Sequence, residues 1–251
     1  MIALLLNGDI FSTSGMSLLA LGFFLGLKHA LDADHVIAVS TIVSERRGIL
    51  SSGIVGAMWG IGHTFSLLVV GLIVIALNLE IPERVASLME LAVAGMLVAL
   101  GSNVLWKLSR GGQLHAHVHT HGNITHAHPH VHEHAGEPSH SHVSRLARHL
   151  GKSKRSILIG MVHGLAGSAG LMLIVLATIP STSLGLLYIG VFGLGSIGGM
   201  LVMSTVIGLP FALTATRSAS WNSAIRGVSG ILSVGFGLYL GWQIGFTGGL
   251  F

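Results

Sequence analysis

The sequence predicts an all-α integral membrane protein whose six transmembrane helices form a 3+3 inverted repeat. Three observations support this prediction: the composition, the number of long apolar segments and the distribution of basic residues. Of the 251 residues, 51% are hydrophobic and only 9% are charged. The mean hydropathy of +0.78 lies far outside the balance of soluble domains. The 36 glycines suit helices that approach one another closely in lipid.

Six segments are long and apolar enough to cross a bilayer, which takes roughly 20 residues. The first segment is overlong and carries charged residues, so we expect a bend or a broken helix within it. The opening stretch MIALLLNGDIF is too short to span and lacks a basic start, and we interpret it as an extracytoplasmic lead-in rather than a signal peptide. The six predicted spans cover residues 16–43, 53–77, 86–106, 156–179, 184–208 and 225–246.

The basic residues predict the orientation in the membrane. Eleven of the 13 Lys and Arg residues lie at one set of span ends, whereas Arg84 lies at the other and Lys28 lies inside the first span. By the positive-inside rule, both termini are extracytoplasmic and the central loop, residues 111–152, is cytoplasmic. The loop separates a first three-helix repeat, 1–110, from a second, 153–251. We expect a multi-pass protein of the cytoplasmic membrane that contacts lipid and binds no nucleic acid.

Internal similarity between the two halves predicts the repeat. Because the repeated unit has three helices, its second copy enters the bilayer from the opposite face, as in many secondary transporters. Glycine-rich apolar helices can also resemble one another by chance, but the matched His29 and His163 argue against that alternative. The matched segments are GLKHALDAD (26–34) with GMVHGLAGS (160–168), WGIGHTFSLLVV (59–70) with FGLGSIGGMLVM (192–203), and, more weakly, AGMLVALG (94–101) with SGILSVGF (229–236).

Several ionisable residues lie within the predicted spans, where such residues usually have a function. His29, Asp32 and His35 would share one face of a regular helix, and a kink would bring Asp34 round to join them. Neutral imidazoles with carboxylate oxygens suit Ni²⁺, Co²⁺ or Zn²⁺, whereas Mg²⁺ and Ca²⁺ prefer oxygen ligands alone. We therefore predict a metal site. Its candidate ligands are His29, Asp32, Asp34, His35, His63 and His163.

One lysine and the absence of cysteine narrow the chemistry that we expect at this site. Lys28 lies four residues before Asp32, and we expect the two to pair and to leave Asp34 for the ion. The chain has no cysteine, which excludes thiolate ligands, disulfides and dithiol redox chemistry.

The motif HALDADH, with His29, Asp34 and His35 in the spacing HX4DH, resembles the signature of the nickel/cobalt transporter (NiCoT) family. GIGHTFSLLVV resembles the second motif of that family. VHGLAGSAGL is similar to the six-span branch labelled urease-accessory or high-affinity nickel transport proteins. The resemblance implies passage of Ni²⁺ or Co²⁺, with His29, Asp34 and His35 as signature residues and His63 as the histidine of the second motif. The chain departs from the larger, eight-span members, whose second acidic motif is replaced here by HGLAGSAG.

Residues 115–142 of the central loop form a low-complexity segment that holds 11 of the 16 histidines. We expect it to be disordered without ligand, because it has little to bury. Alternating His-x-His offers many interchangeable sites for transition ions, so we interpret the loop as a cytoplasmic metal buffer; a solvated spacer is the alternative. The loop histidines are His115, His117, His119, His121, His126, His128, His130, His132, His134, His140 and His142.

Taken together, the motifs predict a secondary transporter that moves Ni²⁺ and/or Co²⁺ through the intramembrane His/Asp site. Uptake is the direction we favour, and efflux by the same fold is the first alternative. An intramembrane metalloenzyme is the second, but the chain has no HExxH motif and no evident general base or nucleophile. We expect no permanent cofactor, because the ion is the substrate. A cytoplasmic metallochaperone is a candidate partner.

Overall fold

The computed structural model describes residues 12–46, 48–77, 82–110, 115–121, 124–130, 142–165, 178–179 and 181–248. The helices are α2 (Thr13–His29), α3 (Ala33–Val43), α4 (Ile49–Leu77), α5 (Glu83–Ser109), α6 (His142–Leu165), α8 (Thr182–Arg217) and α9 (Ala219–Trp242), which continues into the short π-helix η2 (Gln243–Thr247). Two strands, β1 (His115–His121) and β2 (Ile124–His130), lie in the central loop.

Four of the described helices are long and apolar enough to cross a membrane. The pair α2 and α3 makes a fifth span if it is taken as one, bent by 54° at its break. The bend expected in the first segment is therefore confirmed. The predicted span 156–179 falls in part on residues outside the described ranges. The four helical spans are Ile49–Val74, Glu83–Ser109, Thr182–Ala215 and Ala219–Phe246.

The break between α2 and α3 follows from the motif itself. Helix α2 ends at His29, and Asp32 has an extended backbone (φ −61°, ψ 146°) at the N-cap position of α3. The Asp32 side chain does not cap α3. Asp34 lies in the first turn of α3, where the unpaired N–H groups and the helix dipole favour a negative charge. The motif thus ends one helix, starts another and places a carboxylate at a helix N-terminus.

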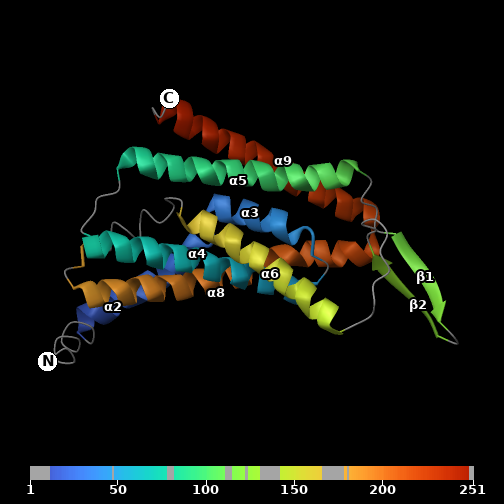
Figure 1. The fold of residues 1–251 in the computed structure, drawn as a ribbon, viewed down its shortest axis with the longest axis horizontal. Helices are drawn as coiled ribbons and strands as arrows, with labels where there is room; N and C mark the ends of the chain where they lie inside the picture. The colour runs from blue at the N-terminus through green and yellow to red at the C-terminus, as the bar shows by residue number, and fades with distance from the viewer. Residues whose placement is uncertain are drawn as a thin grey trace.

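The helices pack as two groups with α3 between them (Figure 1). Helix α4 packs along α8 and α6, α2 packs along α8, and α5 packs along α9. Helix α3 contacts α8, α9 and α5. Large apolar side chains such as Phe24, Leu50 and Val206 are exposed on the outer faces of these helices, as expected for surfaces that face lipid.

Glycines set the closest helix crossings. A Cβ atom at Gly26 would collide with the carbonyl oxygen of Phe192, and one at Gly160 would collide with the carbonyl oxygen of Trp59. Gly26 and Gly160 occupy matched positions in the aligned halves, and so do Phe192 and Trp59. The α2–α8 and α6–α4 crossings therefore use the same contact. A second matched pair of contacts is Gly62 on Ile157 and Gly195 on Phe23.

Two stretches of the central loop, His115–His121 and Ile124–His130, form strands, although we expect the loop to be disordered. Strands β1 and β2 pair antiparallel, with His115, His117 and His119 opposite His130, His128 and His126 respectively. His-x-His is a pattern of period two, which is the period of a strand. Gly122-Asn123 between the strands is a two-residue hairpin signal. The low complexity of the segment hid this pattern.

Candidate metal site

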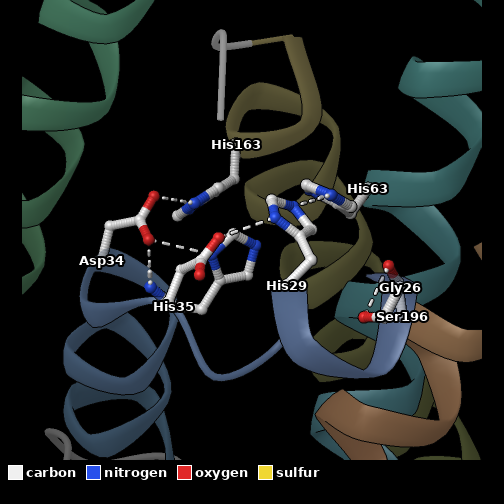
Figure 2. A network of polar contacts seen from close by, with 8 residues as sticks. Gly26, His29, Asp34, His35, His63, His163 and Ser196 are labelled. Atoms are coloured by element: carbon white, nitrogen blue, oxygen red, sulfur yellow. Dashed lines mark hydrogen bonds and ion pairs between the residues drawn. The ribbon is translucent and has the colours of Figure 1, made fainter. Parts of the chain in front are cut away.

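Five of the six predicted ligands converge at one place inside the helix bundle (Figure 2). His29 ends α2, Asp34 and His35 begin α3, His63 lies in the middle of α4 and His163 lies near the end of α6. His29 is 6% exposed, and the other three histidines are fully buried. Residues far apart in the sequence thus meet in a water-poor environment, where polar groups need partners.

The first potential ligand group consists of His29, His35 and His63. One ligand atom from each lies within 4.8 Å of the others. The Nε2 atoms of His29 and His63 are 3.1 Å apart, and the ring centroids of His29 and His35 are 4.5 Å apart. This spacing suits three imidazoles around one ion.

The second group consists of Asp34, His35 and His163, again with one ligand atom each within 4.8 Å. Asp34 Oδ2 lies 2.9 Å from His163 Nε2, and Asp34 Oδ1 lies 3.0 Å from His35 Nδ1. The backbone N–H of His35 also donates to Oδ1 of Asp34 at 2.9 Å. His35 therefore belongs to both groups, and Asp34 links α3 to α6.

The hydrogen bonds fix which ring nitrogens carry a lone pair. A carboxylate only accepts, so in neutral rings Nδ1 of His35 and Nε2 of His163 carry the protons that they donate to Asp34. Nδ1 of His29 likewise carries a proton and donates it in a hydrogen bond to Asp32. Nε2 of His29 is therefore unprotonated and accepts a hydrogen bond from Nε2 of His63. The remaining nitrogen of each of His35, His63 and His163 then has a free lone pair.

These nitrogens are also the ones without partners. Nε2 of His35, Nδ1 of His63 and Nδ1 of His163 are buried and form no hydrogen bond within the described ranges. Native proteins rarely leave buried polar atoms unsatisfied. Lone pairs on neutral imidazoles, together with a carboxylate oxygen and no sulfur, form a donor set that suits Ni²⁺, Co²⁺ or Zn²⁺.

The structure does not bring Asp32 into either ligand group. Its Oδ2 accepts from Nδ1 of His29 at 2.8 Å, and its side chain is 43% exposed. Lys28, the partner predicted for Asp32, is exposed and forms no ion pair among the described residues. The broken helix explains the difference, because the unwound turn directs Asp32 back to the end of α2. A carboxylate in this position orients the imidazole and fixes its tautomer.

Two aromatic residues that the sequence did not single out border the cluster. The Trp59 ring lies 5.4 Å from that of His35 and 5.2 Å from that of His163, and the Phe192 ring lies 5.5 Å from that of His29. Both aromatic side chains are buried. They occupy matched positions in the two halves, which is the only sequence signal that could have found them. Their rings help to exclude water from the imidazoles.

The matched positions in the second half carry different chemistry. Ser196 corresponds to His63, and its hydroxyl donates to the carbonyl of Gly26 at 3.3 Å. It thus supports a helix crossing and offers no imidazole. Ser168, which corresponds to Asp34, lies outside the described residues.

The loop histidines are separate from this cluster. Seven of them occupy alternating positions of β1 and β2, and His142 begins α6. In the antiparallel register, three histidines of β1 have histidines of β2 as their backbone partners. His132, His134 and His140 lie outside the described residues.

The apolar helices and the buried histidine and carboxylate groups define a multi-pass membrane protein of the metal-ion transport class. The family described as high-affinity nickel-transport protein (NicO) matches residues 15–238, and the chain belongs to this family. It is 37% identical to the urease accessory protein UreH of Bacillus sp. (strain TB-90) over 94% of the chain and 95% of that protein.

A second relative is more distant. The chain is 24% identical to the chloroplast protein FOR GROWTH AND FERTILITY 2 of Arabidopsis thaliana, over 94% of the chain and 59% of that protein. No solved structure matches the chain. The family confirms the resemblance found in the motifs and the prediction of a transporter rather than an enzyme.

Proposed function

We propose that this protein is a secondary transporter that carries Ni²⁺, and Co²⁺ as a related substrate, into the cytoplasm through the buried cluster. One observation carries the proposal: four imidazoles and one carboxylate from four helices converge, and three of the ring nitrogens have no partner among the described residues. Borderline divalent ions prefer this donor set, and the lack of sulfur allows them to be released again. The ligands are His29, Asp34, His35, His63 and His163.

The two ligand groups suggest how the ion moves. His35 is common to both, so an ion bound by His29, His35 and His63 can pass to Asp34 and His163 without losing every protein ligand. Full release into an apolar interior would be far more costly than this exchange. His35 is accordingly the residue on which the whole path depends.

We propose that the two halves form an inverted repeat and that this repeat lets the site open to each side in turn. Its support is the matched glycine contacts, which make the α2–α8 crossing equivalent to the α6–α4 crossing. In repeat-built transporters, one bundle rocks against the other around a site near the midplane. Movement of α6 relative to α3 would make and break the contact between His163 and Asp34, which are 2.9 Å apart.

The orientation that we propose places both termini outside and residues 111–152 in the cytoplasm. It rests on the distribution of Lys and Arg. Because the chain has no cysteine, single cysteines introduced at Ser12 and Ser139 can be labelled unambiguously in intact cells with an impermeant reagent. We expect labelling at position 12 and none at 139; the reverse pattern would overturn the orientation.

The hairpin supports the proposed role of the loop as a cytoplasmic metal buffer. Cross-strand pairs bring residues within reach of a shared ion, and three such pairs are histidine with histidine. Deleting residues 115–142 should leave transport measurable and shift its apparent affinity or the metal tolerance of cells. Complete loss of transport in a correctly inserted deletion protein would show that the ion must pass through the loop. If the loop is such a buffer, a cytoplasmic metallochaperone is the partner that we propose to accept ions from it.

A flux experiment in proteoliposomes of known sidedness tests the proposal. Uptake of ⁶³Ni²⁺ would be followed with and without an imposed proton gradient, for the unmodified protein and for His35→Ala. We expect flux from the extracytoplasmic to the cytoplasmic face, with Co²⁺ as a competitor, and no flux in the variant. Flux only in the opposite direction would identify an exporter, and equal flux in the variant would exclude the cluster as the path.

A further inference from the structure

A cavity lies at the end of the bundle where the basic residues gather, apart from the buried histidine cluster. Its volume is about 220 Å³, and it is formed between the C-terminal end of α3, the last turns of α5 and the middle of α6. In α3 the lining residue Thr41 lies seven residues after Asp34, so about 10 Å of helix separates the cavity from Asp34. Its polar lining includes Glu45, Arg46, Asn103, Lys107 and Arg155.

Three cationic side chains line this cavity against one carboxylate. Lys107 Nζ lies 2.7 Å from Oε1 of Glu45, which is the only carboxylate in the lining. The lining therefore has no further carboxylate to pair with the guanidinium groups of Arg46 and Arg155. The cavity wall carries a net positive charge.

Arg46 is held in an unfavourable setting. Its Nε is buried and has no hydrogen-bond partner among the described residues. Burial lowers the pKa of Arg46 below its usual value, and the charge of Arg155 lowers it further, while Glu45 acts in the opposite direction. A guanidinium stays protonated under these conditions. An anion bound beside it would offset its buried charge and accept a hydrogen bond from Nε.

The charges exclude a role for this cavity as a second cation site. Ni²⁺ entering it would meet two guanidinium groups and an ammonium group at short range, and the one carboxylate is already paired with Lys107. The volume is below that of typical pockets for drug-sized ligands, about 300–1,000 Å³. A small anionic group fits both the charge and the size.

We infer that this cavity binds a phosphate group, held by the guanidinium groups of Arg46 and Arg155 at the basic end of the bundle. The planar guanidinium fork matches phosphate oxygens in pairs. Basic pockets between transmembrane helices are a known setting for anionic lipid headgroups. The phosphate can come from such a headgroup or from soluble phosphate. The inference does not depend on the transport of nickel.

Thermal unfolding of the full-length protein in lipid nanodiscs tests the inference. Nanodiscs of phosphatidylglycerol would be compared with nanodiscs of phosphatidylcholine, and inorganic phosphate with chloride at equal ionic strength. We expect phosphatidylglycerol, phosphate or both to raise the unfolding midpoint, because a ligand of the folded state stabilises it. Arg46→Gln and Arg155→Gln should lose most of this shift. Arg217→Gln, an exposed arginine at the end of α8, should keep it.

Asn103→Asp is a second variant that keeps both arginines. It places a carboxylate in the cavity lining at almost unchanged shape and should also reduce the shift. A shift with inorganic phosphate in phosphatidylcholine identifies the soluble anion as the source, whereas a shift with phosphatidylglycerol alone identifies the lipid. No shift from either, or a shift in the three cavity variants equal to that of the unmodified protein, would overturn the inference. Ni²⁺ binding by each variant shows that it is folded.

Discussion

The two halves of the molecule share their helix packing but not their chemistry. Gly26 and Gly160 make the same contact with carbonyl oxygens at matched positions, so the backbone crossings are equivalent. The proposed ligands are not equivalent, because four come from the first half and, among the described residues, only His163 comes from the second. Close helix packing therefore requires glycine at the same positions in both halves. Metal coordination has no such requirement, so most of the proposed ligands can lie in one half, beside its interface with the other.

This asymmetry gives His163 a special position. Among the described residues it is the only proposed ligand in the second half, and its Nε2 lies 2.9 Å from Oδ2 of Asp34 in the first half. If the halves rock against each other, the coordination of the ion changes mainly at this contact. The following predictions test the comparison, from the largest expected effect to the smallest.

Replacing His35 should have the largest effect, because His35 belongs to both ligand groups. In His35→Ala we expect ⁶³Ni²⁺ uptake to fall by more than roughly 100-fold. Loss of a residue that only supports a ligand typically costs no more than that. His29→Ala and Asp34→Ala should come next, since each removes one group. The loop variant His119→Ala is the matched control. Near-normal uptake by correctly inserted His35→Ala protein would refute the shared ligand.

Replacing His163 tests whether the second half takes part in binding. By equilibrium dialysis we expect His163→Ala to weaken Ni²⁺ binding by more than the roughly 10- to 100-fold that loss of a supporting residue costs, because it removes a direct ligand. Ser196→Ala, at the position matched to His63, should bind Ni²⁺ normally because its hydroxyl contacts only a backbone carbonyl. Normal binding and uptake by His163→Ala would confine the site to the first half.

Replacing Asp32 should have a smaller effect than replacing a ligand. Its carboxylate orients His29 from 2.8 Å, and loss of such a group typically costs about 10- to 100-fold in metal affinity. Asp32→Asn should be milder than Asp32→Ala, since an amide oxygen still accepts from Nδ1. Lys28→Ala should bind Ni²⁺ almost normally. A Lys28→Ala defect as large as that of Asp32→Ala would restore the ion pair that we first expected.

The shared packing is tested by stability rather than by binding. Gly160→Ala places a methyl group against the backbone of Trp59, and we expect it to cost about 1–3 kcal/mol. Gly95→Ala is the matched control, because nothing lies within 4 Å of a Cβ atom there. That variant should be neutral or up to about 1 kcal/mol more stable. Unfolding in a mixed detergent series would measure both, and equal stability would contradict the role of the close crossing.

Much of the fold followed from sequence because its signals are strong in lipid. Apolar length placed the helices, and the charged motif HALDADH marked the break. The convergence of His63 and His163 with the motif was predicted from the sequence similarity between the two halves. The partner of Asp32 could not be predicted, because a side chain in an unwound turn follows local backbone angles. Trp59 and Phe192 could not be singled out from the sequence, because an aromatic residue beside a site does not differ in type from the many other apolar residues of the spans. The hairpin was hidden by low complexity.

The most direct test of the central claim is nickel K-edge X-ray absorption on the loop-deleted protein with one bound Ni²⁺, compared with its His35→Ala and His163→Ala variants. We predict nitrogen and oxygen ligands with the scattering pattern of several imidazoles, and fewer imidazoles in each variant that still binds. A spectrum without imidazole, or one unchanged in both variants, would contradict the claim that the buried histidines of both halves hold the transported ion.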